Sequence, residues 1–148
     1  MTWSQANTWI ASLNTADYLG YSDWELPSAI NSDGTEPCSG LGCAGSQMGQ
    51  LYYTSLGNTL AGGLTNSGPF ANLQPSYYWS STDYGPDTSH AWVFNFDDGA
   101  QGTDNKDDTL YAWAVAQAAV PEPSTILLIG SGLIGYFAFR RQLAKVGS

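Results

Sequence analysis

The chain has 148 residues, of which 43% are hydrophobic and 14% aromatic, and this composition is too apolar for an intrinsically disordered protein. Its formal net charge of −9 is unevenly distributed, because residues 1–119 hold twelve acidic residues and one basic residue, and the remainder is basic. The acidic part is expected to repel nucleic acid and sulfated polyanions and to tolerate cations or neutral sugars. Its size suits one small domain with one core.

A helix is predicted at the start of the chain, over residues 3–14. Its apolar residues recur at helical spacing on one face, and Thr2 with Gln5 three positions later forms a capping box. A turn then leads to the segment 24–27, Trp-Glu-Leu-Pro, which is expected to be a short buried crossing that Pro27 ends.

A loop over residues 29–45 separates this crossing from a second predicted helix. The loop is rich in Asn, Asp, Gly and Pro, the residue types that form turns. The helical spacing of apolar residues returns at 48–56, where Ser46 is a suitable N-cap and Gly57 is a suitable stop.

The loop contains the two cysteines of the chain, Cys38 and Cys43, in the sequence Cys-Ser-Gly-Leu-Gly-Cys. In an oxidising compartment this spacing favours a local disulfide that closes a glycine-rich loop. A metal site would need further ligands nearby, and none of the neighbouring residues is another Cys or a His. A free or redox-active cysteine pair is the remaining alternative.

Three short strands are predicted after a Gly- and Asn-rich loop, over 77–81, 91–96 and 110–116. The middle strand alternates clearly, with Trp92, Phe94 and Phe96 on one side, and the Asp-Asp-Gly sequence that follows it is a turn signal. Two helices followed by a small antiparallel sheet predict an α+β domain.

The tryptophan-centred motifs of this domain resemble the Lcl C-terminal domain family in order and spacing. The resemblance covers nearly all of residues 1–117, and six segments carry it: 3–13, 24–27, 48–58, 78–82, 91–99 and 111–115. It implies a compact fold akin to C-type lectin-like and formylglycine-generating-enzyme domains, on a bacterial surface protein. Glu25 and Ala116 stand where the family usually or often has Arg, so a function that depends on those arginines is not carried over.

Acidic side chains around the predicted turn are candidates for cation binding, because Ca²⁺ prefers several oxygen ligands on flexible loops. The spacing does not match an EF-hand loop, and the alternative is a solvated acidic hairpin. The candidate ligands for Ca²⁺ are Asp97, Asp98, Asp104, Asp107 and Asp108.

Exposed aromatic side chains could form a platform for sugars. Tyr and Trp rings stack on the apolar faces of pyranoses, while carboxylates and amides bind the hydroxyl groups. Trp79 and Trp113 are spaced like residues of a small core and are assigned to it. The predicted contact surface is therefore Tyr77, Tyr84 and the loop around His90.

His90 is the only histidine, and a Ser-His-Asp arrangement could form around it because Asp87 and Ser89 precede it. No Gly-x-Ser-x-Gly elbow is present, and a single histidine in a loop is more often simply solvated. No catalytic residue is assigned, and the chain is interpreted as a non-enzymatic protein.

The C-terminal part of the chain is predicted to leave the domain and enter a membrane. Residues 118–125 form a linker, because two prolines in it disfavour helix. The apolar run 126–139 is shorter than the roughly 20 residues of a comfortable span, and flanking residues extend it. A basic cluster follows the apolar run and consists of Arg140, Arg141 and Lys145. It predicts that 126–148 is a single transmembrane segment with a basic tail that stays in the cytoplasm.

This three-part tail resembles the PEP-CTERM sorting signal of Gram-negative bacteria. The motif occupies Val120, Pro121, Glu122, Pro123, Ser124 and Thr125. The resemblance implies a transient anchor, processed near Pro-Glu-Pro by an exosortase-type membrane protease. An ordinary C-terminal anchor is the alternative and predicts the same topology.

No signal peptide precedes the first predicted helix, although a tail of this type requires export. We therefore expect Met1 to be internal to a longer reading frame that supplies the signal peptide, and possibly a first strand.

These features predict an exported protein that is held outside the cytoplasm by its C-terminal helix and then released to the cell surface or the extracellular matrix. Its predicted role is recognition of a glycan, such as exopolysaccharide, or of another matrix component. Two alternatives are open: a structural matrix or biofilm component that self-associates, and an enzyme of lectin-like fold.

Overall fold

The computed structural model describes residues 1–116, within the first of the two compact units of the chain, Met1–Gln117. The sorting motif, the predicted membrane segment 126–139 and the basic cluster after it lie outside the described residues. Among the residues that are described, no helix is both long and apolar enough to cross a membrane.

The first helix, α1 (Trp3–Thr15), begins at the predicted capping box. The Thr2 hydroxyl accepts a hydrogen bond from the backbone N–H of Gln5 at 3.3 Å, and the Gln5 side chain accepts one from the N–H of Thr2 at 3.0 Å. These bonds satisfy two N–H groups at the helix start, and the predicted helix is confirmed. A short 3₁₀ turn, η1 (Tyr18–Gly20), follows.

The second helical segment consists of α2 (Gln47–Gly49), which continues directly into the π-helical η2 (Gln50–Ser55). Ser46 caps it, since its hydroxyl accepts from the N–H of Gly49 at 3.1 Å. Gly57 follows with φ of 69°, a left-handed conformation that glycine adopts without steric cost. The predicted cap, helix and stop are confirmed, whereas no pattern in the sequence indicates the π-helical widening.

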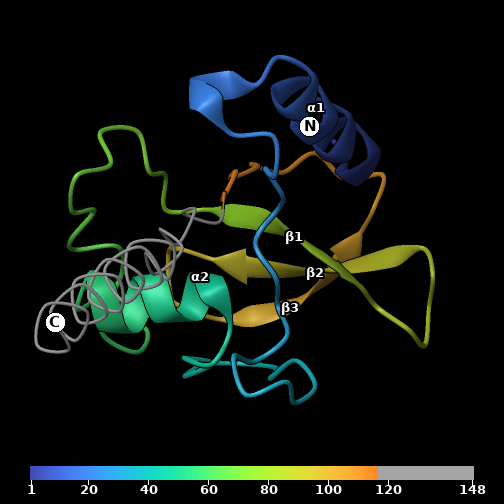
Figure 1. The fold of residues 1–148 in the computed structure, drawn as a ribbon. Helices are drawn as coiled ribbons and strands as arrows, with labels where there is room; N and C mark the ends of the chain where they lie inside the picture. Colours follow the sequence, from blue (N-terminus) through green and yellow to red (C-terminus); the bar gives the residue numbers. More distant parts are fainter. Residues whose placement is uncertain (117–148) are drawn as a thin grey trace, which may run out of the picture. The chain divides into compact units, whose positions relative to one another are not determined.

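The sheet has three antiparallel strands in the order β1 (Tyr77–Asp83), β2 (His90–Asn95) and β3 (Gln101–Asn105). In Figure 1, α1 lies above β1, and α2 lies on the other side of β1, lower in the view. The predicted strands at 77–81 and 91–96 correspond to β1 and β2, and the predicted α+β class is confirmed.

The prediction of a third strand at 110–116 is wrong. That segment makes two isolated bridges, in which Tyr111 pairs with Tyr78 and Val115 pairs with Glu25. The third strand is β3, whose sequence, Gln-Gly-Thr-Asp-Asn, is polar throughout and gives no strand pattern. The buried residue Gln101 ties β3 to the long loop, because the side-chain amide of Gln101 donates to the carbonyl of Cys38 at 2.7 Å.

Two hydrophobic clusters cover the two faces of the sheet. Ala91 and Val93 of β2 point to a cluster with the apolar side of α1, and the fully buried Trp79 joins it from β1. Phe94 and Phe96 belong to a second cluster with Met48, Tyr52 and Leu56 of the second helical segment. Because successive side chains of a strand point to opposite faces, helices on both sides bury β2 almost completely.

The disulfide predicted between Cys38 and Cys43 is confirmed, with 5.4 Å between the two Cα atoms. It closes a loop that is attached to the sheet, because Gly40 and Gln101 exchange two backbone hydrogen bonds of 2.7 and 2.9 Å. The bridge therefore fixes the part of the long loop 29–45 that lies along β3.

Replacing both cysteines by serine is expected to lower the free energy of unfolding by about 2 kcal/mol, because the closed loop no longer restricts the unfolded chain. Urea unfolding of parent and variant measures this difference. The intact mass of the parent from an oxidising compartment should lie about two daltons below its reduced mass. Two thiols that alkylate freely in the unreduced parent would contradict the bridge.

Candidate functional site

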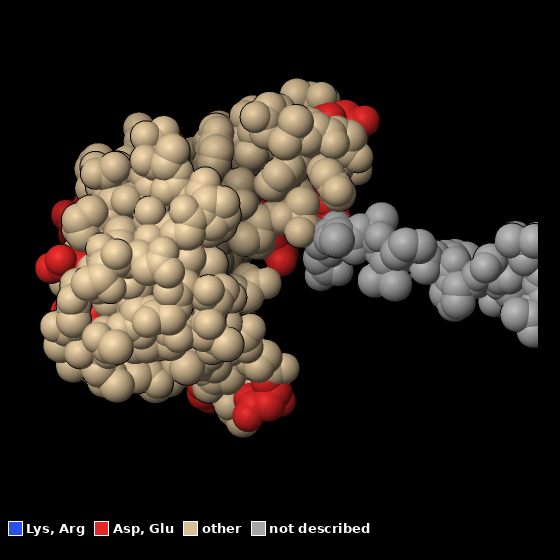
Figure 2. Space-filling model, turned by 90° about the vertical axis from the view of Figure 1, so that its left-hand side faces the viewer, with Lys and Arg blue, Asp and Glu red and all other residues tan. Residues whose placement is uncertain are grey.

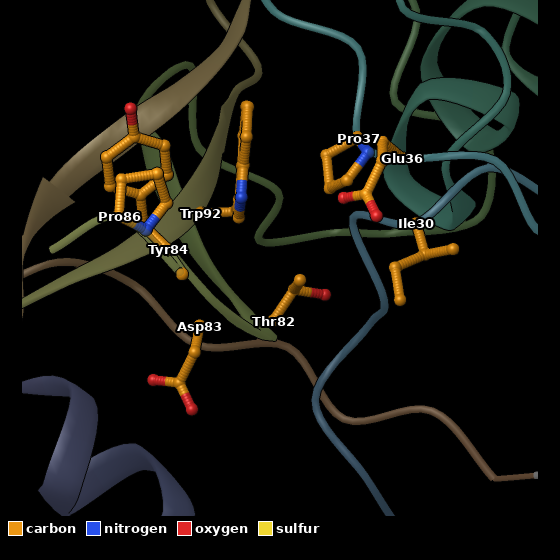
Figure 3. Close-up of a pocket in the computed structure, with 9 residues that line it drawn as sticks. Ile30, Glu36, Pro37, Thr82, Asp83, Tyr84, Pro86 and Trp92 are labelled. Carbon is orange, nitrogen blue, oxygen red and sulfur yellow. The ribbon is translucent and has the colours of Figure 1, made fainter. Parts of the chain in front are cut away.

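A cavity of about 280 Å³ opens where the β1–β2 hairpin meets the loop 29–45. The end of β1 and the turn after it form one side of the cavity, and Trp92 of β2 lies at its centre in Figure 3. Three residues of the long loop form the other side: Ile30, Glu36 and Pro37.

Two aromatic side chains form the apolar part of the cavity. Trp92 lies on the central strand and is half-buried, and Tyr84 follows directly after β1. Their rings meet edge to face, with centroids 5.8 Å apart and planes at 77°. The backbone N–H of Tyr84 donates to the carbonyl of His90 at 3.1 Å, so the hairpin itself fixes the position of the tyrosine.

The opposite wall is held by one hydrogen bond within the loop and one between the loop and β1. The Asn31 amide donates to the carbonyl of Glu36 at 2.8 Å, and the N–H of Ala29 donates to the hydroxyl of Thr82 at 3.0 Å. The disulfide begins one residue after Pro37. Figure 3 shows Glu36 and Pro37 across the cavity from Tyr84, with Trp92 between them.

Polar groups around the cavity are available to a ligand. No hydrogen bond within residues 1–116 uses the Tyr84 hydroxyl, the Trp92 indole N–H or the Glu36 carboxylate, and all three residues line the cavity. The indole N–H groups of three other tryptophans donate to backbone carbonyls: Trp3, Trp24 and Trp79. Trp92 therefore combines an apolar ring with a free donor.

Lys106, the one basic residue among residues 1–116, fixes the hairpin end of the cavity. Its ammonium group pairs with the Asp83 carboxylate, donates to the Thr88 carbonyl at 2.8 Å and lies 4.4 Å from the centre of the Trp3 ring. The charge of Asp83 is therefore compensated, which leaves Glu36 as the free carboxylate of the cavity.

The predicted contact surface is only partly assembled. Tyr84 lines the cavity. His90 lies opposite Tyr84 in the β1–β2 hairpin, but the ring of His90 is not among the lining side chains. Tyr77 is 45% exposed and lies at the opposite end of β1. Sequence reasoning missed Glu36 and Pro37, whose only signal was their position next to the cysteine pair.

A family model for the Lcl C-terminal domain matches residues 1–116, which is most of the chain. The chain belongs to the Lcl C-terminal domain family. No curated protein and no solved structure matches it significantly.

A second family model, the PEP-CTERM protein-sorting motif, matches residues 119–142. Processing by an exosortase-type membrane protein follows from this motif. The Lcl C-terminal domain is thus part of an exported protein that is anchored in a membrane before its tail is processed.

In this Lcl C-terminal domain, His90 is not placed as in a Ser-His-Asp triad. Its Nδ1 lies 2.9 Å from a carboxylate oxygen of Asp87 and 3.0 Å from the hydroxyl of Ser89. A triad has the serine and the aspartate on different ring nitrogens, whereas here both contact the same one. The Ser89 hydroxyl also donates to Asp87 at 2.7 Å, and this bond and the backbone N–H of Ser89 lower the pKa of Asp87.

The five carboxylates predicted as Ca²⁺ ligands do not form one site. Asp97 and Asp98 lie in the turn between β2 and β3, whereas Asp104 pairs with Ala91 near the far end of β3, followed by Asp107 and Asp108. The extended strand β3 separates the two groups. Within residues 1–116, no three acidic, Cys or His side chains converge in a way that could hold a metal ion.

Asp104 and Asp108 are nevertheless close to each other. A hydrogen bond with Asp104, together with the repulsion between the two carboxylates, raises the pKa of Asp108.

The surface of the Lcl C-terminal domain is acidic but not densely charged. On the face shown in Figure 2, the acidic side chains lie in separate groups around the edge, and most of the surface between them is uncharged. Such a face suits neutral ligands better than anionic ones.

Proposed function

We propose that this domain recognises neutral glycan chains outside the cell, with the cavity at Tyr84 and Trp92 as the binding site. One observation carries the proposal: an edge-to-face aromatic pair lies beside a free carboxylate and two free hydrogen-bond donors. A pyranose presents an apolar face for stacking and hydroxyl groups for hydrogen bonds, which are the two features this cavity complements.

Charge narrows the class of glycan. Twelve acidic residues and one lysine lie in residues 1–116, and Lys106 already has partners on three sides. Uronic or sulfated sugars would therefore meet repulsion without a free cation to bind them. A matrix role and a lectin-like mode of recognition agree with the family and with the sorting tail, and the domain acts by binding and not by catalysis.

Tyr84→Ala is expected to weaken binding of a neutral oligosaccharide at the cavity at least about tenfold, which corresponds to about 1.4 kcal/mol. The reason is the loss of the stacking ring, while the hairpin backbone stays in place. A glycan array followed by titration calorimetry on the full chain in detergent measures the change. Repeating both measurements with EDTA tests for Ca²⁺, and loss of binding in EDTA would reveal a metal-dependent site.

Tyr18→Ala is the matched control, because Tyr18 is 49% exposed, packs against one neighbouring ring and lines none of the cavities described. This variant should bind as the parent does. If no glycan binds the parent under either condition and the chain assembles in a concentration-dependent way, the domain is a self-associating structural component instead.

A further inference from the structure

A second set of hollows lies at the other end of β1, around Tyr111. One, of about 430 Å³, is formed between the segment 69–73 and Trp113, and the other, of about 370 Å³, is formed by residues 109–112 with Met1. Both hollows share Tyr111 and Ala112, so the tyrosine stands between them as a ridge.

Tyr111 is held rigidly in this position. Its N–H donates to the carbonyl of Tyr77 at 3.1 Å, and its carbonyl accepts from the N–H of Trp79 at 3.0 Å. Its ring stacks on Tyr78 with centroids 5.3 Å apart and planes at 27°, yet 48% of the residue is exposed. A fixed aromatic ring loses little conformational entropy when a ligand packs against it.

The larger hollow continues the aromatic surface. Phe70 and Trp113 meet edge to face with centroids 4.7 Å apart. No hydrogen bond within residues 1–116 uses the Trp113 indole N–H, the Tyr111 hydroxyl or the Asn72 side-chain amide. As at the first cavity, apolar rings and free polar groups lie together.

None of the side chains that line these two hollows is charged, although the domain as a whole is strongly acidic. The one charged group beside them is the α-ammonium of Met1, which donates to the carbonyl of Leu110 at 2.7 Å. A lining without charged side chains but with free hydrogen-bonding groups matches a neutral, hydroxyl-rich ligand. Two hollows on either side of one ring match successive units of a polymer rather than a single small molecule.

We infer that the Tyr111 ridge, residues 109–113 with the segment 69–73, is a second binding site for an extended neutral polysaccharide, so that one domain holds two chains or two parts of one chain. Tyr78, which also lines the larger hollow, and Asp83 at the first cavity are five residues apart on β1, roughly 16 Å along the strand. The ligand class rests on the proposed function, whereas the residues of the two sites are separate.

The test is the stoichiometry of cellohexaose, maltohexaose and mannohexaose binding to the full chain in detergent, measured by titration calorimetry. We expect two hexasaccharides per parent chain, one for Tyr111→Ala, one for Tyr84→Ala and none for the double variant. Asn72→Ala is a milder second variant, because Asn72 is exposed, and it should weaken only the ridge site several-fold. Tyr18→Ala should keep both sites.

The outcomes separate the two proposals. If Tyr111→Ala and Asn72→Ala both bind like the parent, the second site does not exist, whatever Tyr84→Ala does. If Tyr84→Ala binds like the parent while Tyr111→Ala loses binding, the ridge site stands and the first cavity does not. If sedimentation shows that the parent is an oligomer and Tyr111→Ala a monomer, while the stoichiometry of hexasaccharide binding is unchanged, the ridge is a contact between copies and the inference is overturned.

Discussion

A chain in which Pro121, Glu122 and Pro123 are all replaced by Ala is expected to remain in the membrane at full length, whereas the parent is cut and released. Two prolines disfavour helix and bias the residues before them to extended backbone, the form in which a protease can read a peptide. The apolar run at 126–139 is unchanged in the variant, so insertion should be unaffected. Immunoblots of membrane and released fractions measure the ratio of the two forms.

A host without the exosortase is the matched control for this experiment. The parent in that host should behave as the triple variant does in a complete host, and both should resist extraction of the membranes with carbonate. Release of the triple variant at the parent's rate would mean that 126–139 is an ordinary anchor and that the Pro-Glu-Pro sequence is not read.

Trp79→Ala is expected to cost roughly 3 to 5 kcal/mol and to prevent folding if the domain is as marginally stable as most of its size. Trp79 is completely buried against Ala6, Ile10 and Leu26, and its indole N–H donates to the carbonyl of Met1 at 2.9 Å. The variant therefore loses a large apolar contact and leaves a cavity beneath α1. Urea unfolding followed by circular dichroism measures the change in free energy.

Tyr77→Ala is the control on the same strand, because Tyr77 is 45% exposed and lines none of the cavities described. It should change stability by no more than about 0.5 kcal/mol. If Trp79→Ala unfolds at the same urea concentration as the parent, Trp79 is not a core residue. If that variant also loses glycan binding, Trp79 belongs to the binding surface instead.

The elements that sequence reasoning found are those with a local signal. The Thr2–Gln5 capping box and the Ser46 cap each depend on residues within three positions, so both helix starts could be read directly. β3 could not, because its buried Gln101 is stabilised by the carbonyl of Cys38, a contact 63 residues away in the chain. Polar strands that are held by such distant partners carry no periodic pattern.

The candidate site was predicted in part for the same reason. Tyr84 could be suggested from the aromatic run in the β1–β2 region, and the disulfide from the cysteine spacing. Glu36 and Pro37 reach the cavity only because the bridged loop folds back on the sheet. Closeness in sequence suggests that Tyr77 and Tyr84 share one surface, but the length of β1 separates them.

Lys106 has a consequence for how the released domain would move through a polysaccharide gel. Its charge is held between a carboxylate, a carbonyl and an indole ring, so the other charged side chains that the domain presents to the gel are the carboxylates. A network rich in fixed negative charge would exclude such a molecule by Donnan partitioning. Dissolved salt would weaken this exclusion, because it screens the repulsion between charges that are more than about 8 Å apart at physiological ionic strength. Neutral networks would admit it freely, and only specific contacts would then slow its diffusion.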